Sequence, residues 1–320
     1  MKFAAALLAS VASAAISTRV KFVDHINKFN KSYLTMEEFE ARHILFAYAD
    51  EIVESHNASN STFTLAHNHF STMTEQEKAN TRGRLPSPTT ARKTVTLPTA
   101  DLPSSVDWRD QGAVNAIKDQ GQCGSCWAFS AVCALEASHW KATGDLLSFA
   151  EQQLVDCAGF RYGNLGCNGG LQQNAFKYYE SHNAILESDY KYTAKDGSCQ
   201  YDSLSQTAVE VSDYTMVTAD SASQTKAAVA QQPISVSIEA DKAVFQLYST
   251  GVFDSSRCGT NLDHAVALVG YGSDAGQDYY ILRNSWGTSW GEEGYMRIAV
   301  TGDDAGICGV QSEPLYPSSN

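Results

Sequence analysis

The sequence predicts an α+β protein, in which a helical N-terminal segment precedes a region with helices in its first half and an antiparallel sheet in its second. Three observations predict this class: helical periodicity over residues 20–57, a long apolar run over 126–144, and four alternating segments after residue 233. Residues 80–105 are polar, proline-containing and without a period, so we expect an exposed and cleavable linker there. The chain therefore divides near residue 102.

The first fifteen residues, "MKFAAALLASVASAA", combine one lysine, an apolar stretch and small residues at the end. This pattern predicts a secretory signal peptide over 1–15. A membrane anchor needs about 20 apolar residues, and the polar run Ser17, Thr18 and Arg19 follows too soon for that. We therefore expect no membrane anchor, and a protein of the secretory route in an acidic compartment such as a lysosome or vacuole, or outside the cell.

Charge is unevenly distributed along the 320 residues, whose formal net charge is -13. Residues 16–101 hold ten acidic and ten basic side chains, whereas residues 102–320 hold 26 acidic and 12 basic ones. So strong an acidic excess argues against nucleic acid as a partner. Five of the eight histidines lie in the first block, which acidification would therefore charge positively.

The region after residue 102 carries clear element signals. The run "CWAFSAVCALEASHWKATG" is apolar on most sides, which predicts a buried helix that ends at Gly144. Four later segments alternate as strands of an antiparallel sheet do: "ISVSIEA" (234–240), "HAVALVGYG" (264–272), "DYYILRNSW" (278–286) and "GYMRIAV" (294–300).

Cys123 and Cys126 stand three residues apart at the start of the predicted helix. The pair is compatible with a redox dithiol, half of a zinc site, or two cysteines with unrelated roles. An oxidising compartment favours disulfides among the eight cysteines, and no histidine follows at zinc-ligand spacing. Cys126 falls in the first helical turn, where free N–H groups and the helix dipole stabilise a thiolate, so it suits nucleophilic catalysis if a base lies nearby.

Three histidines after residue 102 are candidates for that base. His139 lies on the same helix, about 20 Å along its axis, and cannot reach Cys126. His182 follows a polar helical run and is expected at the surface. His264 opens a predicted strand, and although a lone histidine there is more often structural, Asn284 offers a side chain that would orient its imidazole.

The motifs "QGQCGSCWAFS", "LDHAVALVGYG" and "RNSWGTSWGEEGYMRI", in this order and after "VDWRDQGAV", resemble those of papain-like cysteine peptidases of the cathepsin L type, made as preproenzymes. The resemblance implies a papain-like two-lobe fold, with a helical N-terminal lobe and an antiparallel, β-barrel-like C-terminal lobe, preceded by a helical propeptide. It implies a signal peptide over 1–15, an inhibitory propeptide with its linker over 16–101, and a mature cysteine peptidase domain over 102–320. We expect a monomeric endopeptidase without metal or organic cofactor.

The resemblance also assigns roles. Cys126 would be the nucleophile, His264 its base and later the acid, and Asn284 the residue that orients His264. Gln120 and the Cys126 N–H would stabilise the oxyanion. Trp286 would shield the hydrogen bond between Asn284 and His264 from water. The family pattern pairs the remaining cysteines, apart from a buried Cys133, as Cys123 with Cys167, Cys157 with Cys199, and Cys258 with Cys308.

Substrate specificity in this family depends mainly on the pocket for the second residue before the scissile bond. The resemblance places Gly169 and Gly170 beside it, Glu313 at its far end, and as its walls Leu171, Gln172, Ser237, Leu262 and Ala265. An ionised Glu313 would accept Arg beside Phe and Leu; the alternative is an ordinary solvated carboxylate. No His-rich insertion like that of cathepsin B is present, which favours endopeptidase activity on peptide and protein substrates.

The N-terminal block resembles a cathepsin L-type propeptide, which acts as an intramolecular inhibitor. One helical face carries Glu38, Arg42, Phe46, Val53 and Asn57, with Ala49 where the family usually has Asn. In "AHNHFST" (66–72), Thr72 replaces the usual Asp, which removes an acid-sensing carboxylate. We hypothesise that His67 and His69 supply the pH response instead. Asn57 and Asn60 begin N-glycosylation sequons.

Two other functions compete with the peptidase. A non-catalytic binding or storage protein on the same fold would most simply lack the cysteine nucleophile. A thiol-disulfide oxidoreductase would need Cys123 and Cys126 to form a dithiol.

Overall fold

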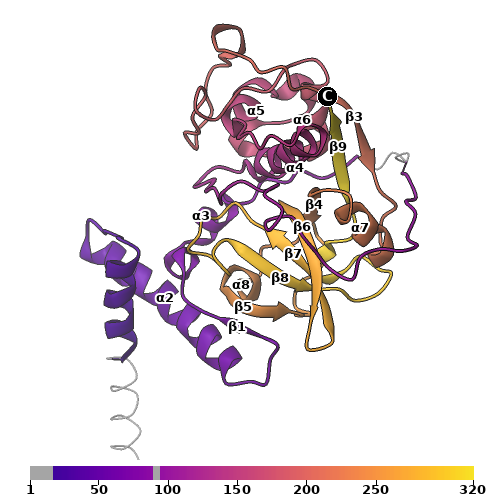
Figure 1. The fold of residues 1–320 in the computed structure, drawn as a ribbon. Coiled ribbons are helices and arrows are strands. Elements are labelled where there is room, and N and C mark those ends of the chain that lie inside the picture. The colour runs from indigo at the N-terminus through magenta and orange to yellow at the C-terminus, as the bar shows by residue number, and fades with distance from the viewer. Residues whose placement is uncertain (1–16, 89–93) are drawn as a thin grey trace, which may run out of the picture.

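The computed structural model describes residues 17–88 and 94–320, so the predicted signal peptide over 1–15 lies outside the described residues (Figure 1). Within those two ranges, no helix is long and apolar enough to cross a membrane. The predicted helical run over 20–57 is two helices, residues 17–28 and α2 (Met36–Asn57). The chain turns between them, where Asn30 takes a left-handed φ of 48° and Thr35 caps α2 by accepting from the Glu38 N–H.

The rest of the N-terminal region contains β1 (Phe63–Leu65), the short 3-10 helix η1 (His69–Thr72) and α3 (Glu75–Ala79). β1 pairs antiparallel with β5 (Tyr248–Phe253), so the N-terminal region adds a strand to the sheet of the C-terminal region. Arg42 on α2 connects these pieces, since it donates to the Thr72 carbonyl of η1 at 2.9 Å and to the Glu77 carboxylate of α3 at 2.8 Å. It also lies 3.6 Å from Glu38 on its own helix.

The helical half of the C-terminal region gathers at one end of the molecule (Figure 1) and contains α4 (Cys126–Thr143), α5 (Glu151–Cys157) and α6 (Gln172–Tyr179). The predicted buried helix is confirmed: residues 126–139 of α4 are all buried, and Gly144 ends the helix with a φ of 84°, which favours glycine. The core here combines α4 with large aromatic side chains, among them Phe149, Phe176 and Tyr179.

The second half supplies most of a sheet that has nine strands among the described residues, with the path order β1-β5-β8-β7-β6-β4-β9-β3 and β2 paired to β6. The predicted strands correspond to β4, β6, β7 and β8, whereas β3, β5 and β9 were not predicted. The bounds are β2 (Val106–Asp107), β3 (Val211–Met216), β4 (Ile234–Ile238), β6 (His264–Asp274), β7 (Gln277–Arg283), β8 (Tyr295–Ala299) and β9 (Leu315–Ser319).

The predicted α+β class, with helices first and the sheet second, is confirmed. The sheet is mainly antiparallel, apart from the parallel pair β5 and β8, and it is not closed into a barrel. Two short helices, α7 (Ala222–Val229) and α8 (Ala243–Gln246), complete this half. Its core is rich in aromatic side chains, including Trp286, Trp290 and Tyr280.

The two halves meet where α4 packs against the sheet. The Ser130 hydroxyl lies one turn after Cys126 and donates to the Val266 carbonyl of β6 at 2.6 Å. At the other end of α4, Ser138 accepts from the Ser319 N–H of β9 at 2.9 Å. These contacts fix the first turn of α4 beside the first residues of β6, which is where the predicted nucleophile and base lie.

Candidate active site

Cys126 is the first residue of α4, and its side chain is completely buried. Burial raises the pKa of the thiol to about 11, although the backbone N–H groups of Ala265, Gly83 and Trp127 hydrogen-bond to it and favour the thiolate. Its neighbour Cys123 forms a disulfide with Cys167. The oxidoreductase dithiol and the zinc site are therefore both excluded as roles for the Cys123–Cys126 pair in this structure.

The other cysteines are paired as the resemblance implies. Disulfides join Cys157 with Cys199 and Cys258 with Cys308, with Cα–Cα distances of 4.7 and 4.8 Å. Cys126 and Cys133 are free and buried. In the described part of the chain, no group of three or more His, Cys, Asp or Glu side chains could hold a metal ion.

His264 is the first residue of β6 and is adjacent in sequence to Ala265, whose N–H bonds the Cys126 thiol. Its Nε2 lies 2.9 Å from Asn284 Oδ1, and its ring stacks on Trp286 with 4.6 Å between the centroids. Burial lowers the pKa of His264 to about 3, with a further contribution from Arg82, although the hydrogen bond that His264 donates to Asn284 acts in the opposite direction. Among the described residues, Nδ1 of His264 has no hydrogen-bond partner.

Gln120 lies close to both groups and is fully buried. Its side-chain Nε2 donates to the Cys123 carbonyl at 2.8 Å and to the Thr81 carbonyl at 3.0 Å. Its Oε1 accepts from the Ser285 hydroxyl at 2.6 Å, which fixes the orientation of the amide. Trp286 Nε1 also donates to the Thr81 carbonyl, at 3.1 Å. The Thr81 carbonyl oxygen therefore occupies the Gln120 amide, which the resemblance assigns to the oxyanion.

Residues 81–85, called the covering segment below, lie directly over this site. The Gly170 N–H donates to the Gly83 carbonyl at 2.8 Å, and the Leu85 N–H donates to the Gly170 carbonyl at 3.0 Å. A Cβ on Gly83 would lie 1.9 Å from the Gly124 oxygen, and one on Gly169 would lie 2.6 Å from the Gly83 oxygen. The absence of both side chains thus permits the close approach.

The covering segment corrects the prediction of an exposed linker from residue 80. Thr81 is buried and residues 82–85 are half-buried, because their backbone pairs with Gly170 and with the Asp263 carbonyl. Sequence composition alone predicted solvent exposure, since polar residues and proline are typical of loops whether or not another part of the chain covers them.

Arg84 contacts residues that the resemblance predicts as the walls and far end of the substrate pocket. Its guanidinium forms an ion pair with Glu313, and its Nε donates to the Ser237 hydroxyl at 3.3 Å. The Arg84 side chain is only 5% exposed, so the charge is largely removed from water. Gln172 reaches the same hydroxyl at 3.2 Å. The structure thus brings Glu313, Ser237 and Gln172 together around one arginine.

The remaining predicted wall residues lie beside these three. Ala265 pairs with Ser237 across β4 and β6, and Leu171 is buried immediately before α6. Leu262 approaches Gly309, where a Cβ would lie 2.6 Å from its Cδ2. Arg82, two residues before Arg84, forms an ion pair at 2.9 Å with Asp263, the residue before His264.

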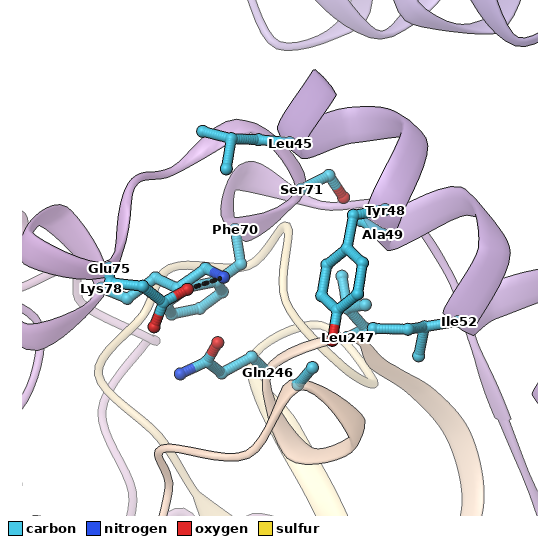
Figure 2. A pocket seen from close by; sticks show the side chains of 11 residues that line it. Leu45, Tyr48, Ala49, Ile52, Phe70, Ser71, Glu75, Lys78, Gln246 and Leu247 are labelled. Carbon is cyan, nitrogen blue, oxygen red and sulfur yellow. Dashed lines mark hydrogen bonds and ion pairs between the residues drawn. The ribbon is translucent and has the colours of Figure 1, made fainter. Parts of the chain in front are cut away.

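The N-terminal region is also anchored away from the covering segment. Phe70 packs edge-on against Trp286 with 4.6 Å between the ring centroids, and Asn68 Nδ2 donates to the Gln246 carbonyl at 2.8 Å. Figure 2 shows a small cavity beside this contact, between α2 and Leu247, with a volume of about 40 Å³. Ala49 lines this cavity. Because alanine is smaller than the asparagine usual in the family, it leaves space unfilled between α2 and the C-terminal region.

Two histidines, His25 and His67, pack against Phe46 in the N-terminal region, and a third, His69, packs against Phe70. His67 stacks on the Phe46 ring at 4.1 Å, and its Nε2 lies 3.0 Å from Asp50 Oδ1. His25 lies 5.2 Å from the same ring, and neither of its ring nitrogens has a hydrogen-bond partner among the described residues. Burial lowers the pKa of His25 and of His69 to about 4. Burial also lowers the pKa of His67, against the raising effect of Asp50.

Sequence reasoning missed His25, Arg82, Arg84 and Asp263. The two arginines flank a glycine in "TRGRLP", which is too short a pattern to indicate contacts with residues far along the chain. His25 lies on a helical face beside Phe22 and Phe29, and that apolar setting was the available signal for its burial.

Known families and proteins match this chain over most of its length. A family model described as "Papain family cysteine protease" matches residues 102–318, and one described as "Cathepsin propeptide inhibitor domain" matches residues 22–77. Digestive cysteine proteinase 2 of Homarus americanus is 42% identical over 327 residues, which cover 98% of this chain and 100% of that protein.

Two solved structures with propeptides are also similar. Recombinant stem bromelain precursor has a TM-score of 0.86 and 33% identity, and procathepsin L 3 of Tenebrio molitor larval midgut has a TM-score of 0.84 and 35% identity. Each match covers 94% of this chain and 99% of the other.

Proposed function

The chain belongs to the papain family of cysteine proteases and carries a cathepsin-type propeptide inhibitor domain, and from this premise we propose that it is an endopeptidase with Cys126, His264, Asn284 and Gln120 as its catalytic groups. One observation carries the proposal: the covering segment places a carbonyl oxygen on the Gln120 amide, directly beside the buried Cys126 and the His264–Asn284 pair. A non-catalytic protein would have no need to retain all four groups under a cover.

In the proposed reaction, the Cys126 thiolate attacks the scissile carbonyl and forms a tetrahedral intermediate. The Gln120 amide and the Cys126 N–H donate to its oxyanion. Protonated His264 then gives its proton to the leaving amine, which leaves an acyl-enzyme, and afterwards takes a proton from the water that hydrolyses it. Asn284 Oδ1 accepts from Nε2 of His264 and so holds Nδ1 free for the thiol.

Latency follows from the electrostatics of the covered site. The low pKa of His264 and the high pKa of Cys126 both arise mainly from burial, so the two groups are neutral under the propeptide. A thiolate-imidazolium pair forms when water and the helix dipole can stabilise the charges. Removal of the covering segment therefore both opens the site and creates the nucleophile.

We further propose that the pocket ending in Glu313 accepts Arg at the second substrate position before the scissile bond, beside Phe and Leu. The support is Arg84, which the protein's own propeptide inserts into this pocket and pairs with Glu313. A guanidinium and a carboxylate form a strong charge-assisted pair when shielded from water. The alternative of an ordinary solvated Glu313 is disfavoured, because its carboxylate already binds a cation in the pocket.

Acid activation is the third part of the proposal. Burial holds His25 and His69 neutral in the folded propeptide, with further contributions from His67, Lys31 and Lys28 at His25, and from Lys31 and His25 at His69. Protonation therefore favours release of the propeptide as pH falls. His67 acts in the same direction but more weakly, because Asp50 and Glu54 oppose the effects of burial and Lys21 on it.

The matched ranges, 22–77 and 102–318, support the proposed division into an inhibitory propeptide over 16–101 and a mature domain over 102–320. The signal peptide proposed over 1–15 rests on its sequence pattern. The three disulfides suit an oxidising secretory route. We place the mature enzyme in a lysosome-like acidic compartment or outside the cell, acting as a monomer on peptide and protein substrates.

The test is activation of the purified proenzyme at about pH 5 with a thiol reductant. Chain mass and hydrolysis of a fluorogenic Phe-Arg peptide are followed together, beside the Cys126→Ser variant. The proposal predicts loss of the propeptide mass with the appearance of hydrolysis, and neither event in the variant. Hydrolysis by the Cys126→Ser variant, or processing by an added protease without any hydrolysis, would contradict it.

A further inference from the structure

The loop that carries Gln120 is hydrogen-bonded by a residue outside the sequence motifs, Tyr192. The backbone carbonyl of Gln120 accepts a hydrogen bond from the phenol of Tyr192 at 2.9 Å, across a sequence separation of 72 residues. Tyr192 belongs to no helix or strand and lies in the segment that follows α6. A residue far from the catalytic motifs therefore contacts the residue that presents the oxyanion amide.

The same phenol is bound to the start of the nucleophile helix. The Tyr192 hydroxyl oxygen lies 2.6 Å from Ser125 Oγ. A phenol has one proton, which Tyr192 gives to the Gln120 carbonyl, so the Ser125 hydroxyl is the donor in the second bond. Ser125 is the N-cap residue of α4, where a serine hydroxyl ordinarily accepts from a helix N–H, but it makes no such cap bond here. Its hydroxyl is used to hold Tyr192 instead.

Tyr192 is itself fixed in place. Its ring packs edge-on against Phe129 of α4, with 4.8 Å between the centroids. Its backbone N–H donates to a carboxylate oxygen of Glu187 at 3.2 Å, and Glu187 lies 3.5 Å from Lys118 Nζ. Because Lys118 is two residues before Gln120, Tyr192 contacts this loop twice: directly at Gln120, and through Glu187 at Lys118.

We propose that Tyr192 is a positioning residue for the oxyanion site: its hydroxyl fixes the Gln120 loop relative to the first turn of α4. The two oxyanion donors, the Gln120 amide and the Cys126 N–H, lie at opposite ends of the short loop that leads into α4, and the Tyr192 hydroxyl bonds near both ends, at Gln120 and at Ser125. Donors of this kind act only within about 2.7–3.1 Å of the developing charge, so a small shift of either donor weakens catalysis. The inference depends on the peptidase function proposed above.

Tyr192→Phe removes only the hydroxyl, and Tyr190→Phe is its matched control. Tyr190 lies two residues earlier, and its hydroxyl donates to Asp156 at 2.6 Å. In the activated enzyme, Tyr192→Phe is expected to lower kcat for a peptide amide about tenfold, a fraction of the loss when an oxyanion donor is removed, with KM nearly unchanged. The rate of Cys126 alkylation by iodoacetamide stays the same, because that reaction forms no oxyanion. Tyr190→Phe changes neither rate.

A double-mutant comparison separates positioning from general damage. When Gln120 is already replaced by Ala, adding Tyr192→Phe is expected to change kcat by less than about twofold, since the amide that it positions is gone. An equal loss of kcat with and without Gln120, or an equal loss of alkylation rate, would overturn the inference. An unchanged kcat in Tyr192→Phe would do the same.

The outcomes distinguish this inference from the proposed function. If Gln120→Ala slows hydrolysis but Tyr192→Phe does not, only the positioning role fails. If Gln120→Ala itself leaves kcat unchanged, the proposed oxyanion role fails and the positioning role with it. If Tyr192→Phe does not fold, Ser125→Ala tests the same link: a severalfold loss of kcat that disappears in the Gln120→Ala background supports the role, and no loss overturns it.

Discussion

Replacement of His25 by Gln tests the proposal that acid releases the propeptide. His25 is 4% exposed, and burial lowers its pKa from 6.5 to about 4 in the folded propeptide. A group with a lowered pKa binds fewer protons in the folded state, so its stabilising effect is present above the unfolded pKa of 6.5 and is lost as pH falls toward 4. Between about pH 7.5 and about pH 5, this loss amounts to about 2 kcal/mol for one histidine.

The assay is urea unfolding of the full Cys126→Ser proenzyme at these two pH values. Tryptophan fluorescence reports release of the propeptide, because Trp286 then loses its contact with Phe70. His25→Gln is expected to lose about 2 kcal/mol less stability on acidification than the parent protein does. The control is His182→Gln, since His182 stacks on Tyr178 in the enzyme part of the chain and should not alter propeptide release. If the free energy of unfolding falls by the same amount on acidification in His25→Gln and in the parent, protonation of His25 does not contribute to release of the propeptide.

Three further predictions concern the active site and its cover. Glu313→Ala is expected to lower kcat/KM for Arg-containing substrates about tenfold or more, with little change for Phe substrates, because a charge-assisted hydrogen bond is lost; equal changes for both substrates would contradict the pocket assignment. Arg84→Ala is expected to leave the proenzyme about tenfold more active than the parent before processing, measured at neutral pH with the fluorogenic peptide, and Lys78→Ala, which removes an exposed pair with Glu75, should not. Asn284→Ala is expected to lower kcat about 100-fold by misorienting His264, and a normal kcat would exclude the orienting role.

Much of the fold could be predicted because its signals are local. The buried helix α4 is apolar on most sides and is followed by a glycine cap, and β4, β6, β7 and β8 alternate in hydrophobicity. The edge strand β3 and its neighbour β9 were missed, since exposed residues weaken the alternation in β3 and a proline interrupts the short β9. The motif residues Cys126, His264 and Asn284 could be selected from short sequence patterns that are themselves local.

The contacts that cover and support the site could not be predicted in the same way. Arg84 pairs with Glu313 across 229 residues, and Tyr192 bonds to Gln120 across 72. Such pairs leave no periodic pattern, and each residue alone looks like an ordinary polar side chain in a loop. The burial of His25 depends on the return of the chain at His67, 6.0 Å away, which no local signal indicates.

In the proposed mechanism, the propeptide keeps Cys126 neutral, and its removal creates the reactive thiolate. The most direct measurement is the rate of Cys126 alkylation by iodoacetamide against pH, in the proenzyme and in the processed enzyme, with a His264→Ala variant beside them. The account predicts almost no alkylation of the proenzyme near neutral pH, rapid alkylation after processing that persists into the acid range, and loss of that acid reactivity without His264. Equal alkylation rates before and after processing would contradict it.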